Sequence, residues 1–389
     1  MTTRSSPSCS LRAPLAKARR IVVKLGSRVL VRADGRPDRA RMAALVRDIA
    51  QLQRSGREMI VVSSGAIASG MEAMGWRTRP KSLPELQMAA AIGQVRLMKL
   101  YDELFRKSQC LTGQMLLTHD GLRDRERHLS ARQTLHALMR HRVIPVINEN
   151  DTVAVDEIKF GDNDQLAALV ALLADADALI LMSTVDGLRA PAGRGRTRRV
   201  PVLRSVTRRE LELVFGARDE FSSGGMASKL QSAHAAARAG IPVVIAHGRT
   251  TGILEKILSG ADVGTLIGEP GSRPRWSARR EWIGFFHHPQ GVISVDEGAR
   301  RALVERGTSL LAIGVTGVRG TFAAESVVDI ADRNGHVIAR GWTCYSADDI
   351  RKVKGLRTAR QTEVLGARDY DEIVHRDHMI VLATSEATA

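Results

Sequence analysis

The chain has 389 residues, of which 44% are apolar, and its formal net charge at pH 7 is +16, with a sequence pI near 10.6. This length is enough for two domains, and the apolar share is that of an ordinary globular protein, which excludes a wholly disordered chain. The positive charge favours anionic partners such as nucleotides, acidic substrates or nucleic acid. Because the charge is spread along the chain, a generally arginine-rich surface explains most of it.

Two features bear on the cellular compartment. Cys9, Cys110 and Cys344 lie far apart and fit neither a disulfide framework nor the spacing of a zinc site, which is usual in the reducing cytosol. The most apolar stretch, residues 166–182, is interrupted by two aspartates, so it predicts a helix followed by a buried strand and not a membrane span. We therefore expect a cytoplasmic protein with no membrane partner.

The chain begins with a basic segment, residues 1–19, that contains Ser, Arg and Lys but no acidic residue. A transit peptide has this composition, although the segment has no apolar core of a secretory signal. We interpret it as a disordered tail.

The next part of the chain alternates between strand-like and helix-like segments. Short β-branched runs predict strands at residues 21–25, 59–62, 114–117, 143–147, 178–182 and 241–246, the last of these being the final strand of the domain. Helices are predicted at residues 37–55, 66–74, 85–107, 123–140, 165–174 and 230–239. The alternation predicts an α/β domain with a mainly parallel sheet over residues 20–268.

Residues 189–209 contain eight arginines and no acidic residue, and glycines suggest a mobile loop. Contact with phosphates or nucleic acid is one interpretation of this segment. We favour a solvated basic flap that attracts anions in general.

A second, smaller domain follows a linker rich in Pro and Gly at residues 269–280. From residue 281 to 370 the segments are short and β-rich, and Asn334-Gly335 is a strong hairpin signal. This pattern predicts a compact, mostly-β barrel with one helix at about residues 297–306, followed by a C-terminal tail at residues 371–389.

Residues 143–165 hold the densest cluster of polar side chains. The buried strand at 143–147 runs into Asn148, Glu149, Asn150 and Asp151, and a second cluster follows at residues 159–164. Ligands bind beyond the carboxyl ends of strands in open α/β sheets, so the two clusters indicate a site. Turn formation is the alternative, in which Asp164 simply caps the helix that follows.

Glycine turns at residues 26, 65 and 224–225 precede helix-like segments, where exposed backbone N–H groups bind phosphate or carboxylate. Lys24 and Lys229 lie beside two of these turns, and together they suggest phosphoryl transfer. An unpaired lysine inside a buried strand is costly, so Lys24 is expected to be functional or paired, whereas Lys229 alone would be ordinary. No Walker A, Rossmann or protein-kinase signature is present, so a kinase here belongs to neither the P-loop nor the protein-kinase class, and a Rossmann dehydrogenase is disfavoured.

Seven stretches resemble the amino acid kinase family. They are VVKLGS (22–27), SSGAIASG (63–70), GQMLLT (113–118), DRERHLSAR (124–132), PVINENDTVA (145–154), GDNDQLAA (161–168) and SGGMASKLQSA (223–233). VDEGARRAL (295–303) is similar to the family's C-terminal PUA domain, and the resemblance runs from about residue 21 to HRDHMIVL (375–382). It implies an α/β three-layer sandwich with a mainly parallel sheet, plus a small PUA-like barrel.

The resemblance to the members with a PUA domain implies ATP-dependent phosphorylation of the γ-carboxylate of L-glutamate, the first step of proline biosynthesis. It assigns Lys24 and Lys229 to the ATP phosphates and the transition state, and Asp164 to holding these lysines. It assigns glutamate binding to Ser64, Asp151, Asp162 and Asn163. Nucleotide binding falls to Lys24, Ser183, Thr184, Ser223, Gly224, Gly225, Met226, Ala227, Ser228 and Lys229.

The resemblance also implies the cofactor Mg²⁺, feedback inhibition by proline, and a homodimer or homotetramer. No residue is assigned as a metal ligand, and whether Asp162 and Asp164 bind Mg²⁺ directly stays open. One departure is visible, because the family often has Thr-Asp where this chain has Ser183-Thr184. The alternatives are a related kinase that acts on another acid, and an RNA-binding protein that uses its PUA domain.

Overall fold

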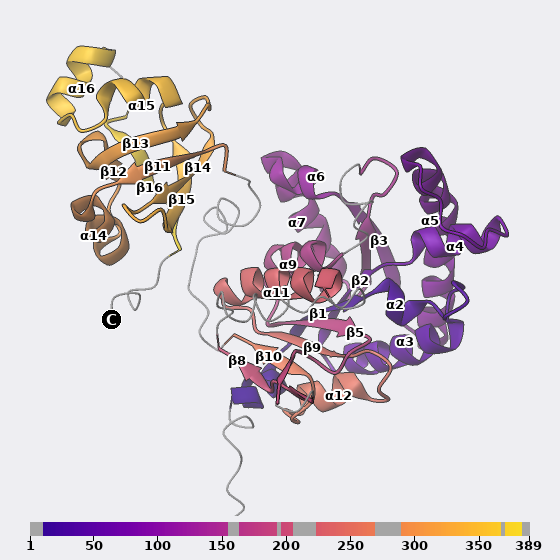
Figure 1. The fold of residues 1–389 in the computed structure, drawn as a ribbon. Coiled ribbons are helices and arrows are strands. Elements are labelled where there is room, and N and C mark those ends of the chain that lie inside the picture. The colour runs from indigo at the N-terminus through magenta and orange to yellow at the C-terminus, as the bar shows by residue number, and fades with distance from the viewer. Residues whose placement is uncertain are drawn as a thin grey trace, which may run out of the picture. The chain divides into compact units, whose positions relative to one another are not determined.

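The computed structural model describes residues 11–154, 163–192, 196–204, 223–268, 289–366 and 370–382. The chain divides into two compact units, Met1–Pro274 and Arg275–Ala389 (Figure 1). The predicted linker at residues 269–280 lies outside the described residues, so the predicted domain limits stay predictions. Within the described part of the chain, no helix is both long and apolar enough to cross a membrane.

The first unit is built on an eight-stranded sheet with the strand order β3-β4-β2-β1-β5-β9-β10-β8. Its strands are β1 (Arg20–Leu25), β2 (Glu58–Ser63), β3 (Thr112–Leu117), β4 (Ile144–Glu149), β5 (Ala178–Ser183), β8 (Val202–Leu203), β9 (Val243–His247) and β10 (Thr265–Ile267). All neighbours are parallel except β9 and β10, so the prediction of a mainly parallel sheet is confirmed. The prediction that the strand at 241–246 is the last one was wrong, because β10 folds back beside it.

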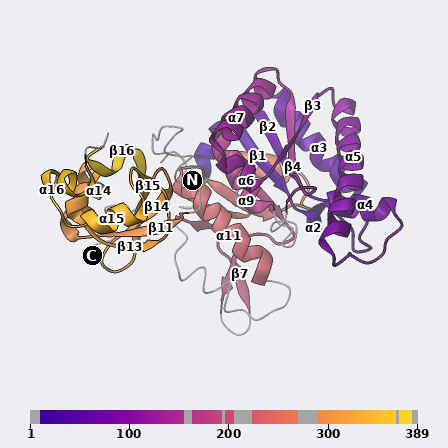
Figure 2. The same cartoon turned by 90° about the horizontal axis from the view of Figure 1, so that it is seen from above.

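Helices cover both faces of this sheet (Figure 2). They are α2 (Ser27–Leu30), α3 (Arg39–Arg54), α4 (Ala66–Ala73), α5 (Leu83–Lys107), α6 (His119–Arg123), α7 (Arg125–Arg140), α9 (Asp164–Leu173), α11 (Ser223–Arg238) and α12 (Ile253–Leu258). Alternate strand residues such as Val23, Val61 and Ile180 pack with α3, α5 and α12 in one buried cluster. With α7, α9 and α11 on the other face, the three-layer α/β sandwich is confirmed.

The helix predicted at residues 123–140 is two helices. The Asp124 backbone is extended, with φ −70° and ψ 128°, and its side chain accepts a hydrogen bond from the Arg127 N–H. Asp124 therefore ends α6 and caps α7, as an aspartate at an N-cap commonly does.

Helices α4 and α5 approach each other through two glycines. A Cβ added at Gly93 would lie 1.8 Å from the Ala66 carbonyl oxygen, and one at Gly70 would lie 1.8 Å from that of Ala89. Only glycine permits this backbone contact. The contact holds α4, which starts directly after the turn at the end of β2, against α5.

The interpretation of residues 1–19 as a disordered tail is wrong for the described residues 11–19. Arg12 is fully buried, and its guanidinium donates hydrogen bonds to the carbonyls of Val263 and Pro201, both at 2.7 Å, and of Gly264, at 3.1 Å. A short 3-10 helix, Ala13–Lys17, follows and leads directly into β1. Arg12 thus joins the start of the chain to the loop before β10.

The described part of the basic segment at residues 189–209 includes a hairpin, β6 (Arg189–Pro191) and β7 (Thr197–Arg199). Arg189 pairs with Asp186 at 2.8 Å, and Arg199 pairs with Asp262 at 3.0 Å. Part of the positive charge therefore holds the hairpin to the unit, while Arg196 and Arg198 are exposed.

The second unit has a six-stranded sheet with the order β12-β16-β15-β14-β11-β13. Its strands are β11 (Gly291–Val295), β12 (Leu310–Leu311), β13 (Val315–Gly320), β14 (Val327–Ala331), β15 (Val337–Thr343) and β16 (Glu372–Val381), and its helices are α14 (Glu297–Arg306), α15 (Ala347–Val353) and α16 (Thr358–Leu365). The predicted helix and the Asn334-Gly335 hairpin are both present, the latter closed by the Asp332 N–H bonding the His336 carbonyl at 2.9 Å. The expected tail differs, because residues 372–381 form β16, which pairs with β12 and β15.

Replacing Arg12 with Met should lower the free energy of unfolding by at least about 2 kcal/mol, because several buried carbonyl groups lose a charged donor. Denaturant unfolding of the whole chain measures this. Arg19→Met is the matched control, since the Arg19 side chain is 75% exposed and its loss should cost less than about 0.5 kcal/mol. Equal stability of the two variants would contradict the role given to Arg12.

Candidate active site

The predicted site residues follow the carboxyl ends of four adjacent strands, β4, β2, β1 and β5. Lys24 lies near the end of β1, Ser64 directly follows β2, and Ser183 is the last residue of β5. The polar run that starts at Asn148 begins within β4 and continues into the next loop. Because the carboxyl ends of neighbouring parallel strands share one edge, the fold brings these side chains to the same side of the sheet.

A buried carboxylate between two lysines lies at the centre of the site. The Lys24 Nζ lies 2.5 Å from one carboxylate oxygen of Asp164, and the Lys229 Nζ lies 2.7 Å from the other. The Asp164 side chain is fully buried, and those of Lys24 and Lys229 are 3% and 12% exposed. The cluster carries one excess positive charge in a place nearly shielded from water, where it attracts an anion strongly.

Each member of this cluster is held by regular structure. Lys24 belongs to the central strand β1, and Asp164 begins α9, where a carboxylate is favoured by the helix dipole. Lys229 lies in the second turn of α11, and its Nζ also donates to the Gly225 carbonyl at 3.3 Å. The spacing of the charges is therefore set by the packing of rigid elements.

Asn163 connects this cluster to two strand ends. Its side-chain amide donates to the Ser63 carbonyl at 2.5 Å and to the Asn148 side-chain oxygen at 2.7 Å. The Asn148 amide in turn donates to the Gln94 side chain on α5 at 2.7 Å. Asn148 and Gln94 were absent from the predicted site, although Asn148 belongs to the first polar cluster in the sequence. Gln94 gave no signal, because it lies in an otherwise ordinary helix.

Ser64 offers a buried hydroxyl to a ligand. Its side chain is 7% exposed, and no hydrogen bond to its hydroxyl is found among the described residues. It lies between β2 and Gly65, whose φ of +107° is readily adopted only by glycine and starts α4. An unsatisfied buried hydroxyl is costly, so a ligand at this position would gain a hydrogen bond.

Asp151 is half-buried in the loop after β4. Loss of hydration, together with the negative charge of Glu149, raises the pKa of Asp151 to about 7, although Arg79 acts in the opposite direction. Asp162, which was also predicted to bind glutamate, falls outside the described residues.

The residues predicted to bind nucleotide form two groups. Ser183 is 9% exposed at the end of β5, and Thr184 is exposed just after it. The run from Ser223 to Lys229 forms the first two turns of α11. Among the described side chains of this run, only Lys229 is placed in contact with Asp164, while the backbone of the first turn presents helix N-terminal N–H groups.

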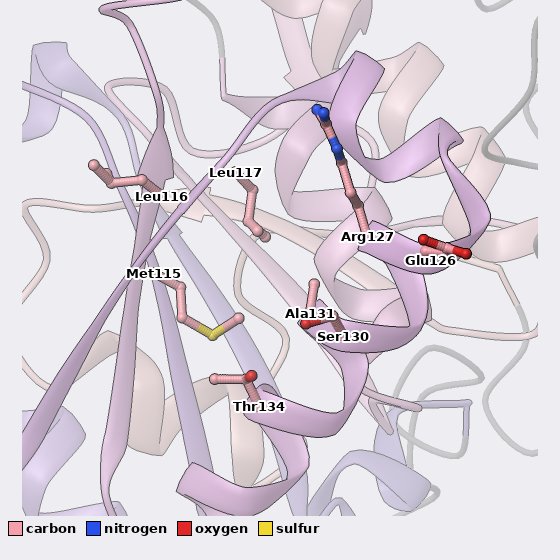
Figure 3. Close-up of a pocket in the computed structure, with 8 residues that line it drawn as sticks. All are labelled: Met115, Leu116, Leu117, Glu126, Arg127, Ser130, Ala131 and Thr134. Carbon is pink, nitrogen blue, oxygen red and sulfur yellow. The ribbon is translucent and has the colours of Figure 1, made fainter.

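A shallow groove of about 480 Å³ lies between the edge strand β3 and α7 (Figure 3). Its lining residues are Met115, Leu116, Leu117, Glu126, Arg127, Ser130, Ala131 and Thr134. None of them belongs to the predicted site.

No group of three or more His, Cys, Asp or Glu side chains in the described ranges is arranged to hold a metal ion. Both oxygens of Asp164 are already engaged by lysines, so this carboxylate does not fit a metal ligand.

Comparison with known proteins identifies both parts of the chain. The model of the Amino acid kinase family matches residues 19–247, and that of the PUA domain matches residues 291–365. Glutamate 5-kinase of Moorella thermoacetica is 43% identical over 373 residues, covering 95% of this chain and 98% of that protein. Glutamate 5-kinase of Myxococcus xanthus is 45% identical with the same coverage. A solved structure, carbamate kinase from Giardia lamblia bound to AMP-PNP, is 16% identical with a TM-score of 0.47 and covers 65% of this chain and 99% of that one.

Proposed function

The chain belongs to the amino acid kinase family, within its glutamate 5-kinases, and from this premise we propose how its residues carry out the reaction. The protein is a kinase that uses ATP to phosphorylate the γ-carboxylate of L-glutamate, giving L-glutamyl 5-phosphate, the first step of proline biosynthesis. The observation that supports the assignment of roles is the contact of Lys24 and Lys229 with opposite oxygens of Asp164.

The reaction needs charge compensation more than it needs a base. The attacking group is a carboxylate with a solution pKa of about 4.3, which is already ionised at neutral pH. One of its oxygens forms a bond to the γ-phosphorus as the bond from that phosphorus to the bridging oxygen of ADP breaks. The repulsion between the two anions is the main barrier that a protein can lower, by alignment and by nearby positive charge.

We propose that Lys24 and Lys229 supply this positive charge and that Asp164 keeps their ammonium groups at a fixed separation. An ammonium group has three donors; Lys229 directs one to Asp164 and one to the Gly225 carbonyl, which leaves it a third for a phosphate oxygen. The buried position of the cluster supports this role, because charge interactions are stronger where water is excluded.

Glutamate binding is proposed for Ser64, Asp151 and Asn163, and for Asp162 by resemblance alone. The free Ser64 hydroxyl suits a carboxylate acceptor, and an ionised Asp151 suits the α-ammonium group. Asn163 has its side-chain amide engaged with Ser63 and Asn148, which supports a role in fixing the site, while its contact with glutamate is proposed from the resemblance alone.

Nucleotide binding is proposed for Lys24, Ser183, Thr184 and the run from Ser223 to Lys229, which also contains Gly224, Gly225, Met226, Ala227 and Ser228. The chain has Ser183-Thr184 where the family resemblance leads us to expect Thr-Asp, so it offers no carboxylate there. We propose that Mg²⁺ enters with the nucleotide phosphates, because the described residues offer no fitting set of ligands. The protein then acts on the nucleotide–metal complex as its substrate.

The remaining partners are proposed from the family resemblance. They are proline as a feedback inhibitor and further copies of the chain in a homodimer or homotetramer. A cytoplasmic location is also proposed, and the separated cysteines support it. RNA binding by the second unit is a second candidate function. It is proposed from the resemblance of this unit to the PUA domain.

With MgATP and hydroxylamine, which traps acyl phosphates as hydroxamates, the purified chain should give a hydroxamate with L-glutamate. L-Aspartate and N-acetyl-L-glutamate should give none, and proline should suppress the signal from glutamate. Hydroxamate from another acid in the panel would show that the protein phosphorylates that acid by the same type of reaction. No product from any of them would refute the proposed function.

Lys229→Ala should lower kcat by about 100-fold or more, because a charge that acts on the transferring phosphoryl group is lost. The KM for glutamate should change far less. Lys256→Ala is the control, since this lysine lies on the exposed side of α12 and should leave both constants unchanged. A raised KM with normal kcat would be inconsistent with the role assigned to Lys229.

A further inference from the structure

A chain of three side-chain amides lies beside the lysine cluster, and its last member, Gln94, has no role in the mechanism above. The Asn163 amide donates to the Asn148 side-chain oxygen at 2.7 Å, and the Asn148 amide donates to the Gln94 side-chain oxygen at 2.7 Å. Asn163 is the N-cap of α9, Asn148 belongs to β4, and Gln94 lies on α5. The chain of amides therefore joins three elements that surround the substrate side of the site.

One backbone carbonyl fixes the direction of every hydrogen bond in this chain. The Ser63 carbonyl can only accept, so the Asn163 atom that contacts it at 2.5 Å is the amide nitrogen. The same nitrogen contacts Asn148, which must therefore present its oxygen there and turn its own nitrogen towards Gln94. Gln94 in turn presents its oxygen to Asn148. The Gln94 nitrogen, with its two N–H donors, is thereby left at the end of the chain.

The Gln94 nitrogen lacks an acceptor. It is shielded from solvent and forms no hydrogen bond with the residues that the structure describes. A buried donor in this state is costly, because it has lost its hydrogen bonds to water and has gained none within the protein. A ligand that supplies an acceptor at this point would remove that cost.

Gln94 lies beside the turn that carries Ser64. The residue before it, Gly93, packs so closely on α4 that an added Cβ would lie 1.8 Å from the Ala66 carbonyl oxygen. The Ser64 hydroxyl is also buried, and it too forms no hydrogen bond among the described residues. Two buried donors without acceptors thus occur where α5 meets the start of α4. Such a pair suits a ligand that is rich in acceptors, such as a carboxylate.

We propose that the Gln94 side-chain amide donates to the α-carboxylate of glutamate, which makes Gln94 a residue that determines specificity for an α-amino acid. This inference rests on the proposed function, in which the γ-carboxylate is directed to the lysine cluster. Asn163 adjoins Asp164 of that cluster, whereas Gln94 lies at the opposite end of the chain of amides. The carboxylate that meets Gln94 is therefore the one remote from the transferred phosphoryl group.

A second amide of α5 holds the loop after β4 and provides a matched control. Gln87 lies seven residues before Gln94, which is two helical turns, so both side chains leave the same face of the helix. The Gln87 amide donates to the Ala154 carbonyl at 3.2 Å. Gln87 therefore has its acceptor within the protein, and its role is to support the loop.

Two substitutions separate a substrate contact from a structural role. Gln94→Glu keeps an oxygen that accepts from Asn148, but it replaces the N–H donors by a negative charge that repels the α-carboxylate. Gln94→Met removes both the acceptor and the donors without adding charge. The KM for glutamate should rise about 10-fold in Gln94→Met and about 100-fold or more in Gln94→Glu. The kcat should change by less than about threefold, because the contact is made equally before and during phosphoryl transfer.

KM and kcat are measured by ADP release at pH 8 with saturating MgATP, and 4-aminobutyrate supplies a second readout as a competitor of glutamate. It has the ammonium group and the reacting carboxylate of glutamate but lacks the α-carboxylate. Its inhibition constant should therefore change by less than about threefold in Gln94→Glu, although the KM for glutamate rises steeply. Gln87→Met should instead change both constants by the same factor, since a looser loop affects both ligands.

Several results would overturn the inference. They are a wild-type KM for glutamate in Gln94→Glu, a larger loss in Gln94→Met than in Gln94→Glu, and an equal loss for both ligands in Gln94→Glu. The last two would show that Gln94 only orients Asn148. If 4-aminobutyrate binds too weakly to inhibit, the order of the two Gln94 variants decides, and if Gln94→Met does not fold, the KM of Gln94→Glu decides alone. A wild-type chain that releases no ADP with glutamate would refute the proposed function itself, which distinguishes the two failures.

Discussion

The contact of one buried carboxylate with two ammonium groups constrains the whole active site. Asp164 is fully buried, so its ionised form is tolerable only because Lys24 and Lys229 approach its two oxygens at 2.5 and 2.7 Å. Burying the ammonium group of either lysine here would in turn cost free energy without the carboxylate. The three charges come from β1, α9 and α11, which are far apart in the sequence, so the sheet and the helices on this face must be correctly packed before the cluster can exist.

The substrate side of the site depends on the same edge of the sheet. Asn163, the residue before Asp164, joins the start of α9 to Ser63 and Asn148 through hydrogen bonds. The residue that fixes the lysines and the residue that fixes the polar loop after β4 are therefore neighbours in the chain. Under the proposed roles, this arrangement couples the placement of ATP and glutamate, because a shift at the start of α9 would move both the positive cluster and the loop after β4.

Much of this could be predicted from local sequence. The buried, β-branched run around Lys24 indicated both the strand and the need for a partner, and the polar run from Asn148 to Asp151 indicated where a site begins. Interactions between distant residues could not be predicted in this way. Arg12 was interpreted as part of a disordered tail because its carbonyl partners lie about 190 to 250 positions later and carry no side-chain signal. Gln94 was missed for the same reason, since it is ordinary until the fold brings it beside Asn148.

The central claim is that Lys24, Asp164 and Lys229 work as one unit in phosphoryl transfer. A cycle of Lys24→Met, Asp164→Asn and the double variant tests it most directly, with the single-turnover rate of phosphate transfer at saturating ATP and glutamate as the readout. If Asp164 acts by holding the lysines, the loss of rate in the double variant should be clearly smaller than the product of the two single losses. If the two losses multiply, each residue acts independently and the account of the site is wrong.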